Sequence, residues 1–157
     1  MGRTRPIRLI VALAMLAWVA VVLAGCDGKT PANPQVVING RSWFVDLART
    51  PQEQAQGLAG RQHLPEDVGM LFIFEKPSEL VFCMRGCDIP IDVAFISADL
   101  RVVSIHTMAV EPDRAGRVGY RSGQDAVYAL EVAGGGLTRA GVHVGDHVQF
   151  VSIPTQN

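Results

Sequence analysis

Short apolar runs separated by turn residues recur along the chain from residue 36 onward. The runs at residues 70–74, 80–84 and 91–97 are rich in β-branched and aromatic side chains, which favour strands. Turn residues separate such runs about every ten positions. The pattern predicts about eight or nine short strands in an all-β domain, a mainly antiparallel β-sandwich or a barrel-like fold.

Two breaks in the apolar pattern set the expected strand boundaries. Residues 75–79 are polar and contain Pro77, which predicts a turn between the two neighbouring apolar runs. Residues 120–122 are expected to form a separate edge piece before a strand at residues 126–132.

One hairpin and one short helix are expected early in the domain. Asn39 and Gly40 form a dipeptide that favours a tight hairpin turn. Thr50 can cap a helix whose first position is Pro51, and Glu53 completes a capping box with Thr50. The helix is therefore predicted to begin directly after Thr50.

The first 25 residues have the composition of an export signal. Arg3, Arg5 and Arg8 precede an uncharged apolar run at residues 9–23, and small residues precede Cys26. The pattern resembles bacterial lipoprotein precursors, which implies that Cys26 is acylated and becomes the new N-terminus. A retained transmembrane helix is the alternative, although the run is short for a span of about 20 residues.

Residues 26–35 are predicted to tether this anchor to one domain at residues 36–153, because they contain two prolines and few apolar side chains. Export and lipidation would place the protein in the cell envelope, on the periplasmic side of the inner or outer membrane. Eleven of the fourteen basic residues and all fifteen acidic ones lie after residue 25, which leaves a formal charge of −4. That charge argues against binding to nucleic acid, for which a basic patch is expected.

Polar residues gather where the strands at residues 80–84 and 91–97 are joined. Asp92 lies inside an apolar strand, and so does Glu131 further along the chain. A carboxyl in such a position must be hydrogen-bonded, ion-paired or open to water. Arg61 is either a solvated cation or a partner of Asp92 or Glu131.

The same stretch resembles the signature of the DUF192 family, small bacterial and archaeal domains of unestablished biochemical role. The matching residues are Phe82, Met84, Arg85, Ile89, Pro90, Asp92 and Phe95, with further matches at residues 57–61 and 69–72. Cys83, Gly86 and Cys87 depart from the usual Trp, Asn and Thr. The resemblance covers about residues 42–151 and implies a compact β-sandwich or barrel-like domain.

The candidate site is a polar cluster around this connection, which would line a small pocket or secure the chain. Its members are Arg61, Met84, Arg85, Asp92 and Glu131.

Cys83 and Cys87 leave three alternatives open: a disulfide, two unpaired thiols, or a metal or redox role. On one regular strand they would lie about 13 Å apart, whereas a disulfide needs Cα atoms within about 7 Å, so the chain would have to turn between them. The four histidines are scattered and show no recognised zinc spacing, and no metal or cofactor is predicted.

These observations favour a non-catalytic binding or accessory module, anchored to the membrane, over an enzyme. The ligand would be a small molecule or an envelope protein. One alternative is a thiol, redox or metal-dependent enzyme centred on Cys83, Cys87 and Asp92. The other is an interaction protein that docks on another envelope component.

Overall fold

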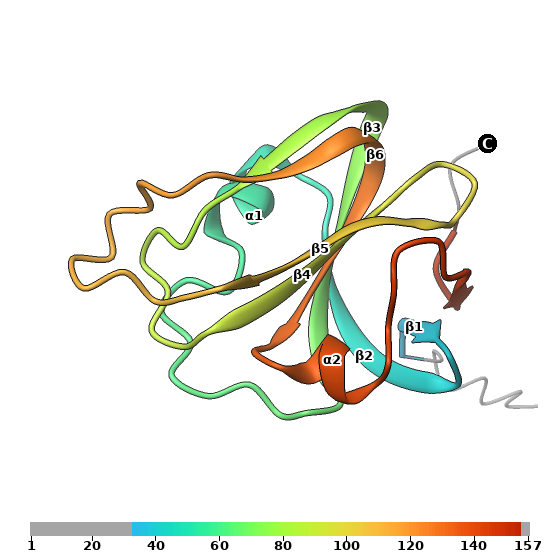
Figure 1. The fold of residues 1–157 in the computed structure, drawn as a ribbon, viewed down its shortest axis with the longest axis horizontal. Coiled ribbons are helices and arrows are strands. Elements are labelled where there is room, and N and C mark those ends of the chain that lie inside the picture. The colour runs from blue at the N-terminus through green and yellow to red at the C-terminus, as the bar shows by residue number, and fades with distance from the viewer. Residues whose placement is uncertain (1–32, 155–157) are drawn as a thin grey trace, which may run out of the picture. The chain divides into compact units, whose positions relative to one another are not determined.

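The computed structural model describes residues 33–154, which fold into one sheet and two short helices (Figure 1). The predicted export signal, Cys26 and most of the predicted tether lie outside the described residues. Within residues 33–154, no helix is long and apolar enough to cross a membrane.

Strands make up most of the described chain, as the sequence predicts. The elements are β1 (Gln35–Ile38), β2 (Arg41–Ala48), α1 (Pro51–Gln56), β3 (Val68–Phe82), β4 (Ile91–Ile96), β5 (Val102–Met108), β6 (Tyr120–Ala133), α2 (Gly136–Arg139) and β7 (Val148–Val151). The seven strands form one sheet in the order β5-β4-β6-β3-β2-β1-β7. Of its neighbouring pairs, β2 and β3 are parallel and the others antiparallel, with α1 on the crossover between β2 and β3. The all-β prediction is confirmed.

The sheet curls until its two edges approach each other (Figure 1). Arg101, just before β5, pairs with His147, just before β7. Two backbone hydrogen bonds support this contact, from Val102 N–H to Asp146 O at 3.0 Å and from Val148 N–H to Leu100 O at 2.8 Å. The result is a half-barrel, and the polar backbone of both edge strands is partly covered at this point.

Two apolar clusters lie on the two faces of the curled sheet. The inner core includes Val102 from β5 and Val148 from β7, so it fills the inside of the curl. The outer core packs Phe72 and Phe95 against residues of the connecting segments, among them Leu58 and Met84. Side chains alternate between the two cores along each strand, because the strand period is two.

The predicted turn at residues 75–79 is wrong, because β3 continues through it. Its pairing with β6 is irregular between Ile73 and Ser78 and again between Glu79 and Val81. Figure 1 shows β3 and β6 bending together there. Residues 75–79 are exposed, and Pro77 lies in the first irregularity, where the absent N–H breaks no regular ladder. A polar bend within a strand has the composition of a turn, which explains the wrong prediction.

The edge piece predicted at residues 120–122 is also wrong, because these residues begin β6. Tyr120 pairs with Phe82 and Arg121 with Val81. Since β3 and β6 each replace two predicted strands, the described sheet has fewer and longer strands than expected.

The predicted hairpin turn and the predicted helix start are both confirmed, because a few neighbouring residues determine each of them. Asn39 and Gly40 turn between β1 and β2 with φ of 52° and 76°. At α1, the Thr50 hydroxyl accepts from Glu53 N–H at 3.2 Å, and Thr50 N–H donates to Glu53 Oε2 at 2.9 Å. This capping box fixes the start of α1, and Gly57 (φ 49°) ends it.

Candidate functional site

The five predicted cluster residues do not meet in one cavity, because the sheet separates the two buried carboxyls. Asp92 on β4 pairs with Val132 on β6, and Val132 belongs to the inner core. Glu131 on β6 pairs with Val93 on β4, and Val93 belongs to the outer core. Paired residues point to the same face, so Asp92 faces the inside of the curl and Glu131 faces the outside.

Asp92 is a fully buried carboxyl with hydrogen-bond donors on both oxygens. The hydroxyl of Thr107, its cross-strand neighbour on β5, donates to Asp92 Oδ1 at 2.9 Å. The backbone N–H of Leu137 in α2 donates to Asp92 Oδ2 at 3.0 Å. Asp92 therefore ties β5 and α2 to β4, which is a structural role.

Arg61 pairs with neither of the two buried carboxyls. Its Nη2 donates to Asp46 Oδ2 on β2 at 2.6 Å, and the two side chains are 36% and 60% exposed. The hypothesis that Arg61 pairs with Asp92 or Glu131 is therefore wrong. No sequence signal pointed to Asp46, which lies at an exposed position of β2.

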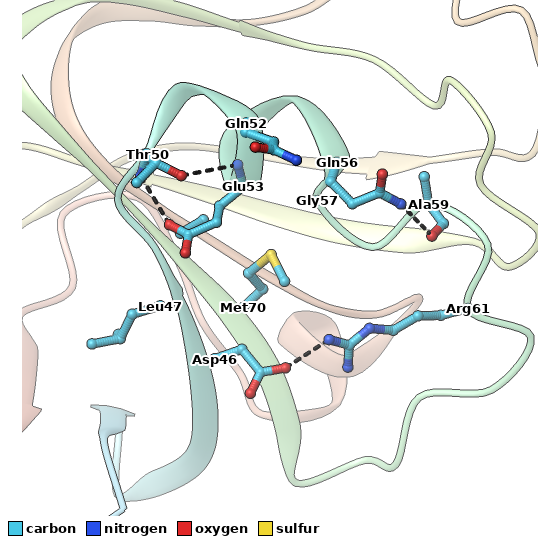
Figure 2. A pocket seen from close by; sticks show the side chains of 11 residues that line it. Asp46, Leu47, Thr50, Gln52, Glu53, Gln56, Gly57, Ala59, Arg61 and Met70 are labelled. Atoms are coloured by element: carbon cyan, nitrogen blue, oxygen red, sulfur yellow. Dashed lines mark hydrogen bonds and ion pairs between the residues drawn. The ribbon is translucent and has the colours of Figure 1, made fainter.

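The α1–β2 pocket, which we define by Asp46, Thr50, Glu53, Arg61 and Met70, is an open hollow of about 650 Å³ (Figure 2). Its charged groups already have partners. Glu53 accepts the backbone N–H groups of Arg49 and Thr50, and these hydrogen bonds hold the pKa of Glu53 below its usual value. Arg61 is held by Asp46, so no ionic group of this pocket needs a ligand.

The Glu131 pocket, which shares Gln56 and Gly57 with the α1–β2 pocket, is about 340 Å³ in volume. Its lining comes from α1, β3, the segment after β3, and β6. The walls include Leu58, Phe72, Phe74, Phe82, Cys83 and Cys87, with Glu131 among them. The lining is about equally polar and apolar, and a volume of several hundred Å³ lies in the range of small-molecule sites.

Glu131 is the one buried carboxyl of the described chain with an oxygen that has no partner. The residue is 5% exposed, and its Oε2 makes no hydrogen bond to any described residue. Burial raises the pKa of Glu131 to about 8, because the charged form is poorly solvated there. At neutral pH the group is mostly a neutral carboxylic acid, able to donate and to accept.

Gly57 allows the chain to pass close to this carboxyl. A Cβ at position 57 would lie 3.6 Å from Glu131 Oε2 and 3.3 Å from the Phe72 ring. With its φ of 49°, the residue occupies a region that glycine adopts most readily. In the sequence, Gly57 indicates a short helix and is part of the family resemblance, and no signal there places it at a pocket.

Three phenylalanine rings form the apolar wall because β3 bends. The Phe82 ring lies 4.8 Å from Phe72 and 6.4 Å from Phe74, both in edge-to-face arrangements. A straight strand would separate Phe72 from Phe82 by about 33 Å. The aromatic wall could not be predicted, because the sequence pattern suggested two strands and gave no angle between them.

Cys83 and Cys87 are free thiols that line the Glu131 pocket. The chain does turn between them, through a 3.1 Å hydrogen bond from Cys87 N–H to Met84 O and a φ of 68° at Gly86. The Cys83 sulfur instead faces Gly116, whose Cβ position would be 2.9 Å away. Of the three alternatives, the structure therefore shows unpaired thiols and not the disulfide.

The Cys87 thiol is poorly suited to act as a nucleophile. Burial, and then the negative charge of a nearby Glu131, raise the pKa of Cys87 to about 11. Met84, three residues before Cys87, is fully buried in the outer core, whereas Arg85 is exposed at the pocket. Within residues 33–154, no group of three or more His, Cys, Asp or Glu side chains could hold a metal ion.

Fold and site together define a half-barrel β-domain with a small pocket of mixed polar and apolar lining against the outer face of its sheet. The chain matches the model of DUF192, a family of uncharacterized proteins, over residues 35–150, and it belongs to that family. No curated protein matches the chain.

Two solved structures resemble the domain. One is a protein from Sinorhizobium meliloti 1021 described as a candidate transcription regulator, with a TM-score of 0.67 and 29% identity, covering 76% of this chain and 93% of its own. The other is a protein of unknown function from Novosphingobium aromaticivorans DSM 12444, with a TM-score of 0.67 and 33% identity, covering 74% of this chain and 82% of its own.

Proposed function

We propose that this domain is a non-catalytic module that binds a small molecule in the Glu131 pocket. The observation that carries the proposal is the buried Oε2 of Glu131, which has no partner among the described residues, in a side chain that lines a pocket of about 340 Å³. A buried carboxyl without a hydrogen bond costs the folded protein free energy. A ligand that supplies the missing partner recovers that cost.

The arrangement of the other predicted residues favours binding over catalysis. Asp92 lies on the opposite face of the sheet from Cys83 and Cys87, and both of its oxygens accept hydrogen bonds. The raised pKa of Cys87 keeps its thiol protonated at neutral pH. An enzyme centred on Asp92, Cys83 and Cys87 would need all three side chains at one site, and the sheet separates Asp92 from the two thiols.

The same proposal places the module in the cell envelope, attached through acylated Cys26 and the tether at residues 26–35. The support is the signal-like sequence before Cys26. The test is fractionation of cells that express the full chain, together with mass analysis of its N-terminus. A Cys26→Ser variant is expected to leave the membrane fraction, and an unmodified N-terminus at Met1 would contradict the proposal.

Transcription regulation, the description of one structural relative, is not adopted for this chain. The charge of −4 after residue 25 does not suit binding to a polyanion. The interaction-protein alternative also stays a prediction, because no described contact favours it.

Binding can be tested with the purified full chain in detergent by screening a set of small polar and apolar molecules by NMR. Ligands are expected to shift the side-chain signals of Phe82 and Cys83, which line the Glu131 pocket. Asp46 and Arg61 in the α1–β2 pocket serve as the internal control, because their signals should stay in place. A screen in which no molecule moves the Phe82 or Cys83 signals would contradict the proposal.

A further inference from the structure

We infer that the Glu131 pocket takes a ligand with a single protonated amine, which pairs with the Glu131 carboxylate while the apolar body of the ligand lies against the phenylalanine wall. The inference deepens the proposed function and rests on it.

The first support is the chemistry of the missing partner. Glu131 lines the pocket, its Oε2 is buried, and no described side chain donates to that oxygen. A carboxyl in apolar surroundings is best stabilised by an opposite charge that also donates hydrogen bonds. An alkylammonium group provides both in a volume small enough for the pocket.

The second support is the aromatic wall beside the carboxyl. Phe72, Phe74 and Phe82 all border the pocket, with ring centroids within 6.4 Å of the central Phe82 ring. The faces of aromatic rings attract cations, and their area also binds the hydrocarbon part of a ligand. A ligand with one charged end and one apolar end fits both features.

The third support is that the neighbouring groups on α1, β3 and β4 give Glu131 no counter-ion. From α1, the pocket is lined by Gln54 and Gln56, which carry no charge. The strand neighbours of Glu131 are Met70 on β3 and Val93 on β4, which are apolar. These elements therefore contribute no counter-ion.

The segment after β3 contributes two thiols and one cation to the pocket. Cys83 and Cys87 are free thiols, and the nearby Asp88 is paired with Arg114. The exposed Arg85 is the cation that lines the pocket, and no ion pair joins it to Glu131. A positive charge near the mouth disfavours a ligand with a second ammonium group, so we expect a monoamine and not a polyamine.

The proton balance of binding distinguishes this ligand class from a neutral one. Glu131 is mostly protonated at neutral pH, because burial raises its pKa to about 8. When an alkylammonium ion binds, Glu131 loses its proton to solvent and the amine keeps its own. The only bond that breaks is the Glu131 O–H bond, whose proton is taken up by the buffer. The affinity should then rise about tenfold per pH unit below pH 8 and level off above it.

The experiment is calorimetry of the purified full chain with hexylammonium and with the neutral hexanamide. Titrations in two buffers with different heats of ionisation give the number of protons released per bound ligand. We expect hexylammonium to bind with the release of close to one proton, and hexanamide to bind at least tenfold more weakly with no release. Glu131→Gln should lower the hexylammonium affinity at least tenfold, while Asp46→Asn in the α1–β2 pocket should leave it unchanged.

Three results would overturn the inference, and they separate it from the proposed function. Tighter binding of hexanamide without proton release would mean that the pocket binds neutral ligands, and the binding role would stand. If Asp46→Asn weakens hexylammonium binding as much as Glu131→Gln does, the ligand binds outside the Glu131 pocket. Failure of both probes, together with an empty NMR screen, would remove the proposed function as well. The number of protons that the wild-type protein releases per bound hexylammonium tests the inference even if Glu131→Gln does not fold.

Discussion

Asp92 and Glu131 are two buried carboxyls in neighbouring strands that have opposite surroundings. Asp92 accepts from a hydroxyl and from a backbone N–H, at 2.9 and 3.0 Å. Glu131 keeps Oε2 without a partner beside a pocket. Burial alone does not distinguish them, since they are 0% and 5% exposed. The difference lies in whether the fold supplies donors, and it is the reason why we propose a binding role for Glu131 and not for Asp92.

The donors are available to Asp92 because its side chain points to the inner face of the sheet, where β5 and α2 supply them. Thr107 lies beside Asp92 on β5, and Leu137 N–H of α2 donates to it. Glu131 also lies near a strand end, two residues before the end of β6, but it points to the outer face, between Met70 and Val93 of the neighbouring strands. Backbone groups there are used in the sheet, so no N–H is left for its side chain.

The largest expected effect follows the removal of the satisfied carboxyl. Asp92→Ala should lower the free energy of unfolding by about 3 kcal/mol, because Leu137 N–H and the Thr107 hydroxyl lose their buried acceptor. Urea unfolding of the variant measures the loss. Asp92→Asn is the control, since it keeps one acceptor oxygen and should lose less. A loss below about 0.5 kcal/mol for Asp92→Ala would show that the hydrogen bonds contribute little.

The second effect is a pH dependence that comes from the unsatisfied carboxyl. The pKa of Glu131 is about 8 in the folded state against 4.5 as its ordinary value, so the folded protein holds an extra proton between these values. Stability from this group is complete below pH 4.5 and is lost as pH rises through 8. We expect unfolding free energy to fall by about 2 kcal/mol from pH 6 to pH 8.

Glu131→Gln is the control for this pH dependence, because glutamine does not titrate. The difference in unfolding free energy between wild type and Glu131→Gln should therefore change across the same pH interval. Parallel pH curves for the two proteins would contradict the raised pKa. The lowered pKa values of Glu53, Asp99, Glu111 and Asp146 act in the acid range, and the raised pKa of Cys87 acts above pH 9, so neither interferes.

A smaller effect tests how closely the chain approaches Glu131. Gly57→Ala should cost about 1–2 kcal/mol, because a positive φ of 49° is combined with a Cβ 3.3 Å from the Phe72 ring. Gly60→Ala is the matched control, since Gly60 has a φ of 78° and open space around it. Equal losses in urea unfolding for the two variants would mean that the contact at the pocket adds nothing.

The smallest effect is expected at the α1–β2 pocket. Arg61→Ala should change the free energy of unfolding by less than about 1 kcal/mol, because the Arg61–Asp46 pair is largely exposed. A double-mutant cycle with Asp46→Ala measures the coupling between the two side chains. A coupling of several kcal/mol would place this ion pair among the main supports of the fold and weaken the contrast with Asp92.

Much of the local structure could be predicted from the sequence, because neighbouring residues determine it. The Thr50–Glu53 capping box, the Asn39–Gly40 turn and the strand at β4 all depend on signals a few residues long. The continuous strands β3 and β6 could not be predicted, because a bend and a turn have the same polar composition.

The placement of Asp92 and Glu131 on opposite faces of the sheet could not be predicted, because it depends on strand register. Alternation assigns each residue a face within its own strand, but it does not say which faces coincide between strands. A shift of β4 against β6 by one residue would place both carboxyls on one face. The Arg61–Asp46 pair depends in the same way on how the chain after α1 approaches β2, for which the sequence has no signal.

The most direct test of the account is a carbon-13 NMR titration of the Glu131 side-chain carboxyl in the ligand-free protein. The account predicts a carboxyl signal that titrates with a pKa of about 8 and that is absent in Glu131→Gln. A pKa near the ordinary 4.5 would mean that water or a protein group already satisfies Glu131, and the contrast with Asp92 would be lost.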